Sequence, residues 1–134
     1  MPRWPANPAN RPGPARGDRV RAERHGRRAE ALAAFYLRLK GYAILEERYR
    51  TPVGEIDLVV RDRGAIVFVE VKARRSAAHE TDALLAVNAG RIGRAAQYFV
   101  SRHPALAGAD MRFDVIFLAP MRWPRHVRNA FALS

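Results

Sequence analysis

The stretch GEIDLVVRDRGAIVFVEVK, residues 54–72, decides the fold of this chain. Two β-rich apolar runs, Glu55–Arg61 and Ala65–Lys72, lie on either side of Asp62-Arg63-Gly64. A short turn-forming sequence between two such runs is typical of a β-hairpin. We therefore predict two antiparallel strands in which the numbers of paired residues sum to about 126 or 127.

Two carboxylates interrupt these otherwise apolar strands, Asp57 in the first and Glu70 in the second. Side chains alternate along a strand, so Asp57 points away from the face formed by Ile56, Leu58 and Val60, which we expect to be core. The predicted register places Asp57 opposite Val69 or Glu70, with the strands roughly 5 Å apart. The two carboxylates should therefore lie close together.

Carboxylates at this separation repel each other unless a cation lies between them. Oxygen ligands suit Mg²⁺ or Mn²⁺, and Mg²⁺ commonly takes one or two carboxylates and fills its other positions with water and substrate phosphate. We expect Asp57 and Glu70 to bind this metal, with the backbone carbonyl of Val71 as a further ligand. Lys72 shares a face with Glu70, where a lysine can orient or deprotonate the attacking water, or neutralise charge on phosphoryl oxygens. This arrangement predicts phosphodiester hydrolysis.

The segments around the hairpin predict helices on a sheet. A helical pattern runs over Asp18–Lys40 and ends at Gly41. One apolar face of this helix contains Leu32, Phe35, Tyr36 and Leu39, and a second stripe, beside Glu30, contains Ala33, Ala34 and Leu37. Strands are expected at Tyr42–Tyr49, Arg112–Leu118 and Val127–Phe131, and a helix at Asn88–Arg102. The order predicts an α/β domain, residues 19–134, with a mixed β-sheet flanked by helices.

Charge and composition indicate the kind of partner. The net charge of +11 favours a polyanion such as DNA or RNA. Of the 24 basic residues only Lys40 and Lys72 are lysines, and Lys72 has no simple structural explanation. Residues 1–18, rich in proline and arginine, are expected to form a disordered basic tail. Without cysteine, a membrane-spanning run or a signal sequence, we expect a cytoplasmic protein that does not bind membranes.

Gly54-Glu55-Ile56-Asp57-Leu58, followed by Phe68-Val69-Glu70-Val71-Lys72, resembles the PD-(D/E)xK nuclease pattern, specifically the bacterial YraN (UPF0102) family, which is similar to archaeal Holliday-junction resolvases. The resemblance covers about residues 24–132. It implies a restriction-endonuclease-like fold, metal ligation by Asp57 and Glu70, and catalytic roles for Lys72 and for Glu30 on the first helix. It also implies cleavage of branched DNA and raises a homodimer as a candidate assembly.

Several further basic and acidic residues are candidates for the site or for structural ion pairs. Arg74 and Arg75 either grip phosphates beside the scissile bond or form a solvated charge cluster. Arg91 stands where many YraN-like chains carry a lysine, and we expect it to contact DNA. Glu55 is a further ligand, a supporting group or an ion-pair partner of Arg50. Asp114 interrupts an apolar strand, where a carboxylate is usually paired, and we expect an arginine such as Arg91 or Arg94 beside it.

Two other functions compete with the nuclease. The chain could be a DNA-binding module that keeps the nuclease fold with little or no activity and uses arginines for phosphate contacts. It could also be an RNA-binding or ribosome-associated protein, which would prefer structured RNA to DNA at matched salt. Metal-dependent turnover separates the first alternative from the nuclease.

Overall fold

The computed structural model describes residues 16–73 and 89–131. In chain order these residues form helix α1 and three strands, then helix α3, a short 3₁₀ helix and two more strands. The bounds are α1 Arg16–Leu39, β1 Ala43–Thr51, β2 Gly54–Asp62, β3 Ala65–Ala73, α3 Ala89–Arg102, η3 Pro104–Leu106, β4 Asp110–Leu118 and β5 Arg125–Phe131. Each predicted element is present, and its ends lie within a few residues of the prediction.

The strands of the described residues form one mixed sheet in the order β1-β2-β3-β4-β5. The pair β3–β4 is parallel and the other neighbours are antiparallel. The β2–β3 hairpin turns at Arg63, which adopts a left-handed φ of 57°. Its paired residue numbers sum to 127, as in Leu58 with Val69, so the predicted register is confirmed.

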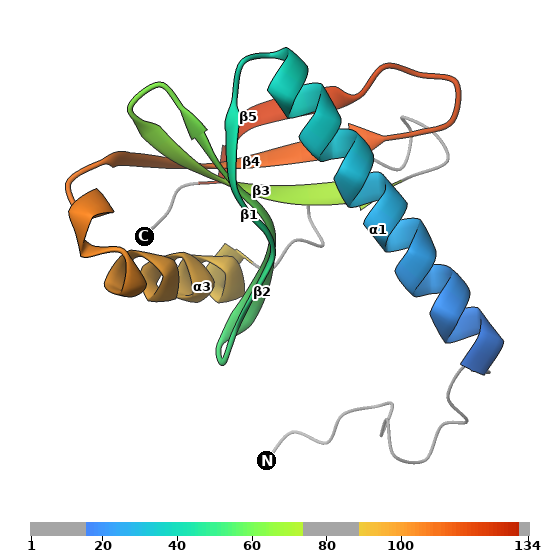
Figure 1. Ribbon diagram of the computed structural model, residues 1–134, viewed down its shortest axis with the longest axis horizontal. Helices are drawn as coiled ribbons and strands as arrows, with labels where there is room; N and C mark the ends of the chain where they lie inside the picture. Colours follow the sequence, from blue (N-terminus) through green and yellow to red (C-terminus); the bar gives the residue numbers. More distant parts are fainter. Residues whose placement is uncertain (1–15, 74–88, 132–134) are drawn as a thin grey trace.

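The two helices cover opposite faces of this sheet (Figure 1). Helix α3 packs its Phe99 against Val59 and Phe68 on one face. On the other face, α1 packs against Leu58 and Val69. Both faces of β2 are therefore core, whereas the sequence predicted one. Ile56 and Leu58 were expected on one face of the sheet. Instead, Ile56 packs on the α3 side and Leu58 packs on the α1 side.

Helix α1 buries the stripe of small residues. Ala33, Ala34 and Leu37 are fully buried, whereas Leu32, Phe35 and Leu39 are about three-fifths or more exposed. Small residues such as Ala33 and Ala34 let the helix axis approach the sheet closely. Of the two apolar stripes predicted for this helix, the alanine stripe faces the sheet, and Tyr36 of the other stripe packs partly against the same core.

The architecture is thus α/β, with a mixed five-stranded sheet flanked by two helices in the described part of the chain, as in restriction-endonuclease-like folds. No helix in residues 16–73 or 89–131 is long and apolar enough to cross a membrane. Residues 1–15, 74–88 and 132–134 lie outside the described residues, and so does most of the predicted tail.

Candidate active site

The site forms where β2 separates from β3. The last pair of this ladder is Leu58 with Val69, so the next positions, Asp57 and Glu70, lie opposite each other. In place of a backbone carbonyl of β2, the Asp57 Oδ2 accepts the hydrogen bond of the Val71 N–H at 2.8 Å. The open end of the ladder thus holds a carboxylate between two strands.

The surroundings of Asp57 disfavour its charge. Burial raises the pKa of Asp57 to about 8, and the nearby carboxylate of Glu70 acts in the same direction. A hydrogen bond between the two carboxyl groups and the charge of Glu30 raise this pKa further, while the Val71 N–H lowers it. Burial and the neighbouring carboxylate therefore favour the protonated form of Asp57.

Lys72 and Glu70 form an ion pair on β3. The Lys72 Nζ lies 3.0 Å from Glu70 Oε1, and the two side chains are 22% and 18% exposed. Side chains two residues apart in a strand point to the same face, which explains the contact. The ammonium group of Lys72 and the carboxylate of Asp57 therefore both lie next to Glu70, and the side chains of Lys72 and Glu70 are partly exposed.

Glu30 reaches this site from α1. Its side chain is 14% exposed, and its Oε2 lies 3.3 Å from the Nε of Arg48. Burial raises the pKa of Glu30, whereas the Arg48 charge lowers it and the charges of Glu55 and Glu70 raise it. Glu30 therefore lies beside the acidic groups of β2 and β3 and is part of the acidic cluster.

Arg48 is a site residue that the sequence analysis did not single out. The residues on either side of it pair with those on either side of Asp57, so Arg48 lies across from Asp57. Arg48 adopts a left-handed φ of 51°, which is costly for a residue with a side chain. Its buried Nε makes no hydrogen bond to any described residue. The strained backbone aims a guanidinium group at Glu30 and, at 3.9 Å, at Glu55.

The remaining predicted residues lie around this cluster or beyond the described chain. Glu55 lies 3.9 Å from Arg50 as well, so the ion-pair reading of Glu55 is confirmed. Arg91, in the first turn of α3, packs against Gly54: a Cβ at Gly54 would lie 3.1 Å from the Arg91 Cγ. Arg74 and Arg75 fall in residues 74–88, outside the described residues.

The predicted partner of Asp114 was wrong. Asp114 is fully buried and is bound by Arg112 on its own strand, with Nε–Oδ1 at 3.0 Å. His126 of β5 lies 2.7 Å from its Oδ2, and the Asn129 N–H donates to Oδ1 at 2.9 Å. The predicted partners Arg91 and Arg94 belong to α3, which covers one face of the sheet, whereas Asp114 faces the α1 side.

The donor set fits a hard divalent cation with few protein ligands. Within residues 16–73 and 89–131, no three His, Cys, Asp or Glu side chains gather closely enough to hold a metal by themselves. Two carboxylates that repel each other are present, which is the number that Mg²⁺ commonly takes from a protein. N–H and C=O of one strand residue point to the same neighbour, so the Val71 carbonyl also faces the opening beside Asp57.

Comparison with known proteins gives a family without a stated activity. Residues 29–118 match the model of "Uncharacterised protein family UPF0102". A UPF0102 protein of Parvibaculum lavamentivorans is 46% identical over 129 residues, covering 96% of each chain. Another, of Methylorubrum extorquens, is 48% identical over 120 residues, covering 88% of this chain and 93% of the relative. The match spans α1 to β4 and therefore includes every residue of the acidic cluster.

Proposed function

Because this chain belongs to the uncharacterised protein family UPF0102, whose name assigns no activity, we propose its function from the site itself. The protein is a metal-dependent endonuclease that hydrolyses phosphodiester bonds in DNA, with a preference for branched DNA. The observation that carries this proposal is the opposed pair Asp57 and Glu70, with Lys72 3.0 Å from Glu70. Paired carboxylates beside a lysine supply the groups that phosphodiester hydrolysis needs.

Asp57, Glu70 and the carbonyl of Val71 would hold the divalent cation. When bound, it would neutralise charge on the phosphoryl oxygens and make water more acidic. The raised pKa of Asp57 supports this assignment, since a carboxylate that folding leaves uncompensated gains most from a cation supplied from outside.

The chain's own residues divide the remaining tasks. Lys72 either stabilises the growing negative charge on the phosphoryl group as an ammonium or orients and deprotonates the attacking water. Glu30, at 14% exposure, is placed to accept or deliver a proton at the edge of the cluster. Arg48 is a positioning residue, because its ion pair holds the Glu30 carboxylate toward Asp57.

A nucleic acid is the substrate class favoured by charge. A net charge of +11 attracts a phosphate backbone, and Arg91 at the start of α3 lies beside the strand that carries Asp57. The small number of protein ligands favours one alternative, a nucleic-acid-binding module on the same fold that lacks turnover.

Cleavage assays with purified protein test the proposal. We expect Mg²⁺ or Mn²⁺ to support cutting of a four-way junction or flap, and Asp57→Asn, Glu70→Gln and Lys72→Ala each to reduce the rate at least about 100-fold. Asp110→Asn is the matched control, because Asp110 is an exposed carboxylate outside the cluster. Equal rates for all variants would reject the site. Salt-sensitive DNA binding without cutting in either metal would establish the binding module instead.

A further inference from the structure

The ion pair between Glu70 and Lys72 differs from the pairs of three other carboxylates in the kind of cation. Glu30, Asp62 and Asp114 are each paired with an arginine. Glu70 is paired with Lys72, whose Nζ lies 3.0 Å from Oε1. Only two of the 24 basic residues of the chain are lysines. The rare residue type therefore lies on a carboxylate that we assign to the cation site.

A lysine leaves a carboxylate more easily than an arginine does. The planar guanidinium group can donate two parallel hydrogen bonds to one carboxylate, whereas an ammonium group is a point charge on a flexible stem. The side chains of Lys72 and Glu70 are 22% and 18% exposed, so the pair is not sealed from solvent. The ammonium group can therefore move away from Glu70 while the strand stays in place.

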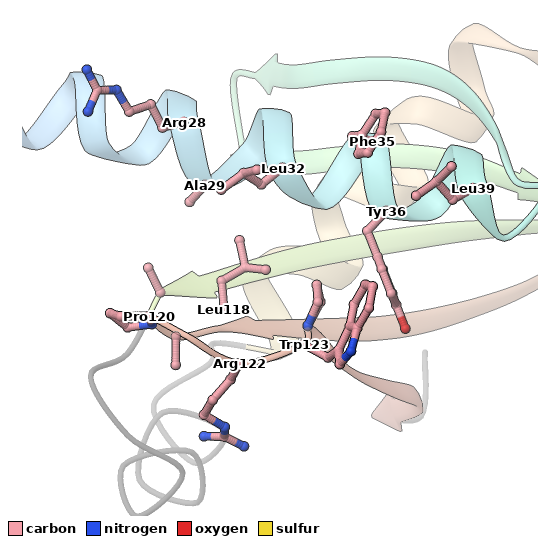
Figure 2. A pocket seen from close by; sticks show the side chains of 13 residues that line it. Arg28, Ala29, Leu32, Phe35, Tyr36, Leu39, Leu118, Pro120, Arg122 and Trp123 are labelled. Atoms are coloured by element: carbon pink, nitrogen blue, oxygen red, sulfur yellow. The ribbon is translucent and has the colours of Figure 1, made fainter.

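Strand alternation decides which carboxylates Lys72 can reach. Its neighbours Val71 and Ala73 face α1, because Val71 packs against the core on that side and Ala73 lines the apolar pocket beside the helix (Figure 2). Lys72 and Glu70 point to the opposite face, like Phe68, which packs in the core beneath α3. Helix α3 contains no acidic residue, so it offers Lys72 no other carboxylate.

Lys72 competes for Glu70 with any cation that binds there. Both need the negative charge of the same carboxylate, and like charges placed side by side repel each other. Glu70 is engaged a second time, because a hydrogen bond joins its carboxyl group to that of Asp57. The Asp57 Oδ2 in turn accepts the hydrogen bond of the Val71 N–H at 2.8 Å. Of these contacts, the ion pair with Lys72 is the one that a cation can replace charge for charge.

We propose that Lys72 is a built-in competitor of the divalent cation, which holds Glu70 until the cation binds and then leaves it. The inference rests on the proposed function, because the cation site at Asp57 and Glu70 belongs to that proposal. It adds an order of assembly to the site. Lys72 becomes free to act on a phosphate group only after the cation has taken Glu70.

Calorimetric titration of Mn²⁺ into the protein tests the competition without DNA and without turnover. Lys72→Met removes the ammonium group and keeps a side chain of similar shape. We expect this variant to bind Mn²⁺ about tenfold more tightly than the wild type, because the competing charge is gone. Lys40→Met is the matched control. It removes the same charge from the other lysine, which is exposed and lies 2.8 Å from Nδ1 of His126, and should leave the affinity unchanged.

A second measurement follows Lys72 in the wild type. Lysine labelled with ¹³C at Cε, next to Nζ, gives two NMR signals, and Lys40→Arg assigns them. We expect Mg²⁺ to move the Lys72 signal toward its position in Glu70→Gln, which lacks the carboxylate partner. The Lys40 signal should stay in place. Because this titration needs no substitution of Lys72, it decides the question even if Lys72→Met does not fold.

Three results would overturn the inference. If Lys72→Met binds Mn²⁺ no more tightly than Lys40→Met, Lys72 does not compete with the cation. Tighter binding by Lys72→Met together with an unmoved Lys72 signal in the wild type would mean that the ammonium group repels the cation but stays on Glu70. If neither the wild type nor Lys72→Met binds Mn²⁺, the competition and the cation site both fail.

The same measurements distinguish this inference from the proposed function. Release of Lys72 by Mg²⁺ in a protein that cuts no DNA would support the competition and refute the nuclease. Metal-dependent cutting by the wild type, together with an unmoved Lys72 signal, would leave the nuclease standing and refute the competition.

Discussion

Asp57 and Asp114 are two carboxylates on strands that flank β3, and the protein treats them in opposite ways. Asp114 is fully buried among Arg112, His126 and the Asn129 N–H, and these donors outweigh burial and lower its pKa. Asp57 has one backbone donor and two acidic neighbours, and burial raises its pKa to about 8. The same fold can therefore satisfy a buried carboxylate completely, yet it leaves the one beside Lys72 short of positive charge. That difference is the reason for proposing a divalent cation at Asp57.

The largest effect should follow from breaking the satisfied carboxylate. Asp114→Ala removes the acceptor that Arg112 and His126 share, whose side chains are 17% and 3% exposed, although Arg112 keeps Asp62 at 3.2 Å. Removing one partner of a buried pair costs about 3–5 kcal/mol. Urea denaturation should show this loss in the free energy of unfolding. The control is Asp110→Ala, which removes an exposed carboxylate on the same strand and should change that free energy by close to zero. A loss below about 1 kcal/mol would show that the network contributes little.

Asp57→Asn should raise the free energy of unfolding instead of lowering it. A carboxyl group whose pKa is raised on folding binds more protons in the folded state. The contribution of Asp57 to the free energy of unfolding therefore falls as pH rises from about 4 to about 8. Asparagine keeps an acceptor for the Val71 N–H and removes the charge. We expect the variant to exceed the wild type by on the order of 2 kcal/mol at pH 8 and to match it near pH 4.

Unfolding free energies of both proteins at these two pH values check this prediction. Asp114→Asn is the contrasting variant. The Asp114 pKa is lowered, so the contribution of Asp114 to the free energy of unfolding is present above about pH 4 and is lost as pH falls. An Asp57→Asn protein less stable than the wild type at pH 8 would contradict the uncompensated state of this carboxylate.

A divalent cation should compensate the charge of Asp57 and so make this carboxylate more like the fully paired Asp114. At ten times its dissociation constant, Mn²⁺ should stabilise the wild type by about 1.4 kcal/mol, because it binds only the folded site. Thermal unfolding at pH 8 measures the shift, and EDTA should reverse it. Asp57→Asn should show little or no shift, whereas Asp110→Asn should behave as the wild type. An identical shift in both variants would place the cation elsewhere.

The sequence predicts most of this arrangement, for reasons visible in particular residues. The turn at Asp62-Arg63-Gly64 sets the hairpin register, and the register alone brings Asp57 opposite Glu70. Strand alternation then places Lys72 with Glu70. Long apolar runs and helical periodicity define the other elements because burial imposes those periods.

What the sequence did not predict depends on contacts between distant segments. The helix face of α1 was misjudged because periodicity weights large apolar residues, whereas close packing on the sheet selects Ala33 and Ala34. Arg112, two residues from Asp114 and on the same strand face, was an available signal for the ion pair. His126 was not, since its approach depends on the β4–β5 register.

Arg48 has the weakest sequence signal, because a basic residue in a polar edge strand suggests only solvent exposure, and a left-handed φ leaves no trace in composition. Its Nε lies 3.3 Å from Glu30 Oε2, and so its removal measures how much compensation the acidic cluster receives from this charge. Arg48→Ala removes this charge and keeps the strained backbone, while Arg48→Gly removes both. The glycine variant should therefore be more stable than the alanine variant by about 1 kcal/mol. Both should raise the pKa of Glu30, because its main compensating charge is gone.

Urea denaturation of the two variants at pH 7, together with carboxyl titration by NMR, separates strain from charge. Arg50→Ala is the matched control: Arg50 also pairs with Glu55, at 3.9 Å, but its side chain is 70% exposed and its loss should cost little. Equal stability of the glycine and alanine variants would mean that the left-handed conformation of residue 48 stores no strain. An unchanged Glu30 titration would mean that Arg48 does not hold this carboxylate in the cluster, and its assignment as a positioning residue would then fail.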